Sequence, residues 1–224
     1  EGFEYSPAKA VRMEPKLGAN QVTFDAWFED AKLGGRVRQT VTLHAGLKRV
    51  DFTNRLESID VMWAREHADR YRDNIYYAFP FAVPGGQIRA EYPGGVVRPY
   101  DDQLRWGSHD FIYATRWIDV SNDLGGVTLA SNEAGTFSLG ELRYNQFAND
   151  YKPTKPWLFS YAWSNRMAGL LTSHPDDCNA TLTYSLTHHD GAWNAGPAAR
   201  HGWEAGSPLL AVPATGGSAA RWQD

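Results

Sequence analysis

A long polar loop at residues 98–110 (RPYDDQLRWGSHD) carries the side chains best suited to binding chemistry. Carboxylates and guanidinium groups can hydrogen-bond sugar hydroxyls, and an aromatic ring can lie against the C–H face of a sugar. The sequence therefore predicts a carbohydrate contact here. In the alternative, Arg98 and the Asp pair only bind each other or fix a domain interface. The candidate residues of this 98–110 loop are Arg98, Tyr100, Asp101, Asp102, Trp106 and His109.

Metal sites and catalytic sites have no signature elsewhere in the chain. The seven His residues are scattered, with no HExxH or CxxC spacing, and the densest group is His188-His189-Asp190. Adjacent residues of a strand point to opposite faces, so these two His side chains are not expected to bind one ion. Several carboxylates could form the pair that glycoside hydrolysis needs, but no spacing selects one. We therefore predict no catalytic residue and no metal ligand in this chain.

Composition indicates a globular chain without a nucleic-acid or membrane role. The chain has 224 residues, a net charge of −4 and no basic run, which argues against nucleic acid as a partner. No apolar stretch approaches the ~18 residues of a membrane span. The single Cys178 cannot form an internal disulfide and so says nothing about the compartment. The chain starts Glu1-Gly2-Phe3, with neither an initial Met nor a signal peptide. We therefore expect either a mature product or, in preference, a piece of a longer polypeptide.

Period-two alternation predicts strands near the N-terminus. Residues 21–29, 36–44 and 50–57 each place apolar side chains on one face and polar ones on the other, with short turns between them. This pattern is typical of an antiparallel meander. Residues 60–73 are charged and predict a short helical turn or an exposed loop. Residues 74–83 are apolar on both faces, and Pro80 places them at an edge, a bulge or a strand end.

The remaining segments complete an all-β prediction. Further strands are expected at 110–120, 126–131, 141–147, 157–163, 166–172 and 179–187. No helix longer than two turns is expected. The sum is a single antiparallel two-sheet domain over residues 1–212, followed by a linker or frayed tail at 213–224.

The middle of the chain also carries motifs in a recognisable order. They are Phe79-Pro80-Phe81, Gly95-Val96-Val97-Arg98-Pro99, Trp117-Ile118-Asp119-Val120-Ser121, the stretch from Gly126 to Asn132, and a last strand ending at His189. Together they resemble the C-terminal β-domain of glycoside hydrolase family 38 α-mannosidases, over roughly residues 20–195. The resemblance implies the all-β, two-sheet antiparallel supersandwich fold shared with galactose mutarotase.

The resemblance also implies a function for a larger enzyme. In that family, retaining hydrolysis of terminal α-mannosides takes place in a catalytic barrel with a zinc ion and an Asp nucleophile, and this chain has no such barrel. We therefore expect a non-catalytic domain without a cofactor of its own. It would pack on the barrel of the same parent chain and help to wall the pocket for a mannoside-like carbohydrate. Segment 141–147 resembles a family strand that leads to Arg residues near the substrate. Here Asn145, Gln146 and Asn149 stand in that stretch.

Two other functions remain open from the sequence. A free-standing carbohydrate-binding module would use the aromatic loop around Trp106. A mutarotase-like epimerase would use acid–base chemistry, with His109 or His188 as candidates. If the domain is a support for another domain, an exposed apolar or aromatic patch is expected, with Trp27 and residues 60–73 as candidates.

Overall fold

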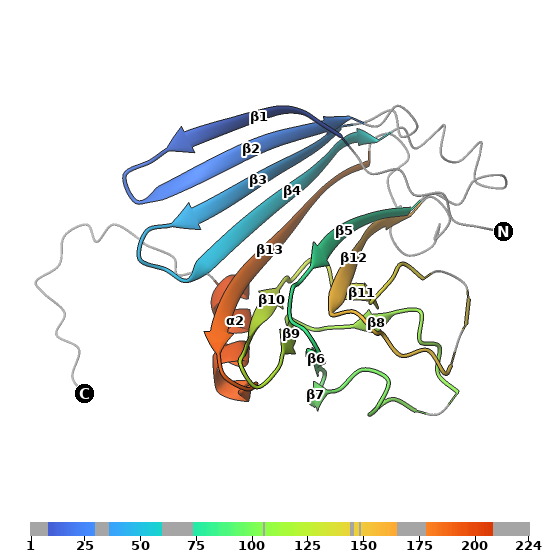
Figure 1. The fold of residues 1–224 in the computed structure, drawn as a ribbon. Coiled ribbons are helices and arrows are strands. Elements are labelled where there is room, and N and C mark those ends of the chain that lie inside the picture. The colour runs from blue at the N-terminus through green and yellow to red at the C-terminus, as the bar shows by residue number, and fades with distance from the viewer. Residues whose placement is uncertain are drawn as a thin grey trace, which may run out of the picture.

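The described part of the chain forms two antiparallel sheets and one helix, which confirms the predicted all-β, two-sheet architecture (Figure 1). The computed structural model describes residues 9–29, 36–59, 74–104, 106–143, 146–147, 149–164 and 178–207. The nine-stranded sheet has the order β1 (Lys9–Leu17), β2 (Gln21–Glu29), β3 (Arg36–His44), β4 (Arg49–Ile59), β13 (Cys178–Asp190), β10 (Gly125–Ala130), β9 (Trp117–Ser121), β6 (Gln87–Tyr92) and β7 (Gly95–Val97). The four-stranded sheet has the order β5 (Asn74–Pro80), β12 (Trp157–Ser164), β11 (Thr136–Leu139) and β8 (Ile112–Tyr113).

The three alternating segments near the N-terminus are confirmed as β2, β3 and β4. Their register aligns Phe24 with Val41, Val41 with Phe52, and Phe52 with Tyr184 of β13. Directly opposed residues in antiparallel strands share a face, so the apolar sets of these strands join into one surface. Towards β9 and β10 this surface becomes the inner face of the sandwich.

The core lies between the small sheet and the half of the large sheet that contains β13, β10 and β9 (Figure 1). Leu158 and Phe79 come from the small sheet, and Ile118, Leu129 and Tyr184 from the large one; all five are buried. The Tyr184 ring lies 5.0 Å from that of Phe79, and its hydroxyl is hydrogen-bonded to Ser160 Oγ at 2.7 Å. Each large apolar side chain buried in this way stabilises the fold by about 1.5–3 kcal/mol.

Strands β1–β3 extend beyond the small sheet (Figure 1) and expose apolar side chains. Met13, Leu17, Phe24 and Leu43 are exposed, and their register places them on the same face as the core. Trp27, the residue expected in such a patch, lies on the opposite face. It is half-buried there between the guanidinium groups of Arg12 and Arg38, at 4.9 and 5.4 Å from its ring centroid. The expected segment 60–73 lies outside the described residues.

The segment predicted as one strand over 110–120 changes sheets. Its first part forms β8 in the small sheet and its second part forms β9 in the large sheet. Between them, Ala114 N donates to Gly135 O at 2.7 Å and Thr115 N donates to Glu91 O at 2.8 Å. The backbone thus keeps its hydrogen bonds while it crosses from one layer to the other.

The strand predicted at 141–147 is wrong for the residues that the structure describes there. Residues 141–143 and 146–147 lie in a loop after β11. The strand predicted at 166–172 and the tail at 213–224 lie outside the described residues. Pro80 is the last residue of β5, at an edge of the small sheet, as its missing N–H requires.

The prediction of no helix longer than two turns is wrong. Helix α2 (Ala195–Gly206) has 12 residues and packs on the outer face of β9 and β10. Asn194 caps it by accepting the Gly196 N–H at 2.9 Å. A Cβ on Gly202 would lie 2.6 Å from Cδ1 of Trp117. This glycine, which favours a turn in isolation, therefore allows the helix to approach a buried Trp side chain.

The polar face of the meander predicts a measurable acid sensitivity. Asp25 is buried and accepts hydrogen bonds from Lys16 Nζ at 2.7 Å and Thr40 Oγ1 at 2.5 Å. These bonds lower the pKa of Asp25 from 3.8 to about 2. A carboxyl group with a lowered folded-state pKa stabilises the fold above its unfolded pKa, and this stability is lost as the pH falls through the folded pKa. Asp25→Asn should therefore be less stable than wild type near neutral pH, with a difference that shrinks between about pH 4 and about pH 2.

Urea unfolding of both proteins across this pH range measures the difference. Asp123→Asn serves as the control, since Asp123 is an exposed turn residue. A difference between wild type and Asp25→Asn that stays constant down to about pH 2 contradicts the assignment.

Candidate functional site

The 98–110 loop follows β7. An ion pair between Arg98 and Asp102 joins two residues at the start of this loop. The Arg98 backbone N–H donates to Asp102 Oδ2 at 2.7 Å, and Arg98 Nη2 donates to Asp102 Oδ1 at 2.9 Å. The hydrogen bonds from Arg98 lower the pKa of Asp102. The Arg98 side chain remains 55% exposed, so the pair is a surface feature of the loop. Sequence reasoning named both residues, and the structure joins them to each other.

Two of the predicted site residues form the buried base of the loop. The rings of Tyr100 and His109 lie 4.6 Å apart, and both side chains are buried. His109 Nδ1–H donates to the carbonyl oxygen of Tyr151 at 2.8 Å, because a carbonyl can only accept. Burial raises the pKa of Tyr100 above its usual range. These two side chains therefore hold the loop in place.

Asp110 connects the 98–110 loop to a second segment without strands, the 140–154 loop, of which residues 140–143, 146–147 and 149–154 are described. Its Oδ2 accepts the backbone N–H groups of Gln146 at 2.8 Å and Phe147 at 2.9 Å. Its Oδ1 lies 3.6 Å from Nε of Arg143, whose guanidinium is 4.0 Å above the ring of Tyr151. Asp110 and Arg143 are both buried. One carboxylate thus fixes the geometry of two loops that are far apart in the sequence.

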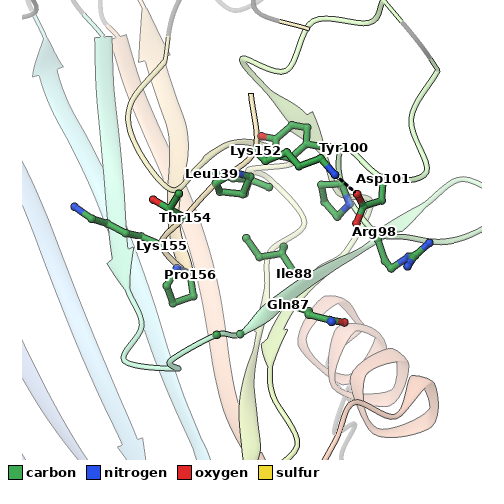
Figure 2. A pocket seen from close by; sticks show the side chains of 14 residues that line it. Gln87, Ile88, Arg98, Tyr100, Asp101, Leu139, Lys152, Thr154, Lys155 and Pro156 are labelled. Carbon is green, nitrogen blue, oxygen red and sulfur yellow. Dashed lines mark hydrogen bonds and ion pairs between the residues drawn. The ribbon is translucent and has the colours of Figure 1, made fainter. Parts of the chain in front are cut away.

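A pocket of about 210 Å³ lies where the two loops meet the start of β6 (Figure 2). Asp101 accepts a hydrogen bond from Lys152 Nζ at 2.6 Å, drawn as the dashed line in Figure 2. Lys155 and Thr154 lie across the pocket from Arg98 in this view. A second pocket of about 460 Å³ shares Thr154 and Lys155 with the first. The pair of pockets offers both charged groups and aromatic rings to a ligand.

Two aromatic side chains project from these loops on strained backbone. Trp106 is 82% exposed with φ 73°, and Phe147 is 71% exposed with φ 50°. Tyr100, with φ 72°, is the third non-glycine residue with positive φ among the described residues. Such conformations cost about 1–3 kcal/mol each and cluster at functional sites. Sequence reasoning found Trp106 and missed Phe147. A lone Phe among polar residues was the available signal.

The other polar clusters have structural roles. His188 is exposed, whereas His189 points to the other face and donates from Nε2 to Asp119 at 3.0 Å. Among the described residues, no three His, Cys, Asp or Glu side chains lie close enough to hold a metal ion. The described part of the chain therefore offers no fit for the zinc that the family resemblance implies. No helix in that part is both long and apolar enough to cross a membrane.

A family model described as the glycosyl hydrolases family 38 C-terminal domain matches residues 7–146, more than half of the chain. The chain belongs to this family. The match confirms the resemblance that the ordered motifs gave, and it includes the whole 98–110 loop. No curated protein shows significant sequence similarity to this chain.

Solved structures of family 38 proteins share the fold of this chain. An α-mannosidase from Enterococcus faecalis V583 matches 82% of this chain with 22% of its own length, at 11% identity and a TM-score of 0.54. A glycosyl hydrolase family 38 protein from Enterococcus faecalis matches 82% of this chain with 23% of its own, at 11% identity and a TM-score of 0.52. A putative aldose 1-epimerase from Klebsiella pneumoniae matches 80% of this chain and 54% of its own, at 12% identity and a TM-score of 0.45. The chain thus spans about a fifth of the family 38 proteins that it resembles.

Proposed function

We propose that this chain is the non-catalytic C-terminal β-domain of an α-mannosidase-like glycoside hydrolase. Its role is to pack on a catalytic barrel of the same parent chain and to help wall the sugar pocket. One observation carries the proposal: the family match comes with a fold that superposes on 22% of an α-mannosidase, the size of a single domain within that enzyme. The zinc ion and the nucleophile belong to the barrel in this proposal.

The uncovered apolar face of β1–β3 supports a packing role. Met13, Leu17, Phe24 and Leu43 are exposed on one side of the sheet. Contiguous apolar surface of this kind is typical of a face that meets another domain or protein.

The 98–110 loop supplies the proposed sugar contacts. Trp106 offers an exposed ring to the C–H face of a sugar, and Asp101 and Asp102 can accept hydrogen bonds from hydroxyl groups. Arg98 can donate, because its guanidinium is still half-exposed beside Asp102. Tyr100 and His109 contribute by holding the loop from below.

The exposure of Trp106 also favours a second candidate, a free-standing carbohydrate-binding module. Such a module would use the same loop without a catalytic partner. The epimerase alternative gains no support from His109, whose ring is buried and hydrogen-bonded to a backbone carbonyl.

Titration with mannose tests the sugar contact. Wild type should bind weakly, since half of the pocket would come from the barrel and each hydroxyl contact must replace water. Trp106→Ala should weaken this binding about tenfold. NMR chemical shifts or Trp fluorescence measure the binding of each protein. Trp203→Ala is the matched control, because Trp203 is exposed on α2 and stacks with Arg116 at 3.9 Å. Equal responses from wild type and Trp106→Ala would remove the loop from the site.

A further inference from the structure

Phe147 combines a high exposure with a backbone conformation that side chains rarely adopt. Its ring is 71% exposed, and its φ is 50°. It lies just beyond residues 7–146, which the family model matches. A residue held in such a conformation without burial of its ring gains little from packing in this chain. The position therefore suggests that the ring serves a contact outside the chain.

The 140–154 loop is built to hold this conformation. Asp110 Oδ2 accepts the N–H groups of both Gln146 and Phe147, and Asp110 is buried. Arg143, also buried, lies beside the other carboxylate oxygen at 3.6 Å. Tyr151 packs against the Arg143 guanidinium and donates its hydroxyl hydrogen to Leu139 O at 2.9 Å. The strained residue is thus fixed by a buried polar frame.

The surroundings of Phe147 fit a saccharide better than a protein partner. Apart from Phe147, the exposed side chains that the structure describes in this loop are polar or charged: Glu141, Gln146, Asn149, Asp150, Lys152 and Thr154. The centre of a protein–protein interface is depleted in charged residues. Amides and carboxylates around an aromatic ring are the groups that bind sugar hydroxyls and C–H faces.

We propose that Phe147 forms the second half of a saccharide-contacting surface that begins at Trp106, with Asp110 as the positioning residue. The inference rests on the proposed function. Trp106 precedes Asp110 by four residues, a reach of at most ~14 Å, and the Phe147 N–H is bound to Asp110 itself. The two rings therefore belong to the two chain segments that Asp110 joins. Two separate aromatic rings can offer stacking faces to two sugar units, so an α-linked mannobiose should bind better than mannose.

The test is a titration of the 224-residue chain with α-linked mannobiose, followed by NMR chemical shifts. Phe147→Gly should bind about tenfold more weakly. Its melting temperature should be unchanged or higher, since glycine adopts positive φ without strain. Phe147→Tyr keeps the ring and should bind like wild type. Leu124→Ala removes another exposed apolar side chain, on the β9–β10 turn, and should change nothing.

Asp110 is tested through a conservative variant. Asp110→Asn can still accept both N–H groups through its amide oxygen and should keep mannobiose binding, whereas Asp110→Ala should lose it. If both variants bind like wild type, Asp110 does not position the surface.

The outcomes separate this inference from the proposed function. Binding weakened by Trp106→Ala but unchanged in Phe147→Gly overturns the inference and leaves the sugar contact of the 98–110 loop in place. A fall in melting temperature that accompanies the loss of binding in Phe147→Gly assigns Phe147 a structural role and also overturns it. No response of wild type to either sugar overturns both the inference and the sugar contact.

Discussion

Replacement of Asp119 by alanine is expected to lower the free energy of unfolding by about 3 kcal/mol. Asp119 is 0% exposed in the middle of β9. Its carboxylate accepts hydrogen bonds from Ser121 Oγ at 2.6 Å, Thr128 Oγ1 at 2.7 Å and His189 Nε2 at 3.0 Å. Removing the carboxylate leaves the buried Ser121 and Thr128 hydroxyls and the partly buried His189 ring N–H without their acceptor. A buried unpaired polar group costs more than the net worth of the bond it made.

Urea unfolding of Asp119→Ala and of Asp123→Ala provides the comparison. Asp123 is an exposed carboxylate in the β9–β10 turn, and its removal should change stability by less than about 0.5 kcal/mol. Equal and small effects of the two substitutions would contradict the structural role of Asp119.

The β-structure was predictable where one face of a strand is buried. In β2, β3 and β4 the alternation of apolar and polar residues follows the two faces of the sheet, so sequence and structure agree. Strand β1 shows no such pattern, since it lies at the sheet edge with mostly exposed side chains on both faces. A one-sided burial signal cannot exist in such a strand.

Helix α2 could not be predicted because its stability comes from tertiary contacts. Gly196, Pro197, Gly202 and Gly206 are poor helix-interior residues. Gly202 is needed, however, for the close approach to Trp117, and His201 donates from Nε2 to Ser185 O on β13 at 3.0 Å. Contacts between elements far apart in sequence thus outweigh local propensity.

The candidate site was predictable as a loop but not as an arrangement. The residue types of the 98–110 loop indicated candidate binding groups, yet they gave no sign that Tyr100 and His109 would be buried. The role of Asp110 depends on backbone N–H groups 36 and 37 residues away, which no local pattern encodes. Phe147 was missed for another reason, because the segment around it was interpreted as a strand.

The isolated chain is expected to be folded and catalytically silent. The described residues form two antiparallel sheets around a buried core. The hydrolysis of α-mannosides in the parent enzyme, as we propose it, depends on a barrel that this fold does not contain.

The most direct test of this account is an assay of the purified chain against an aryl α-mannoside with added zinc, after circular dichroism has shown a folded β-protein. We predict no turnover above that of buffer. Joining the chain to the catalytic barrel of its parent should give activity that requires both parts. Turnover by the chain alone that disappears when one of its own carboxylates, such as Asp101, Asp110 or Glu141, is replaced would contradict the non-catalytic role.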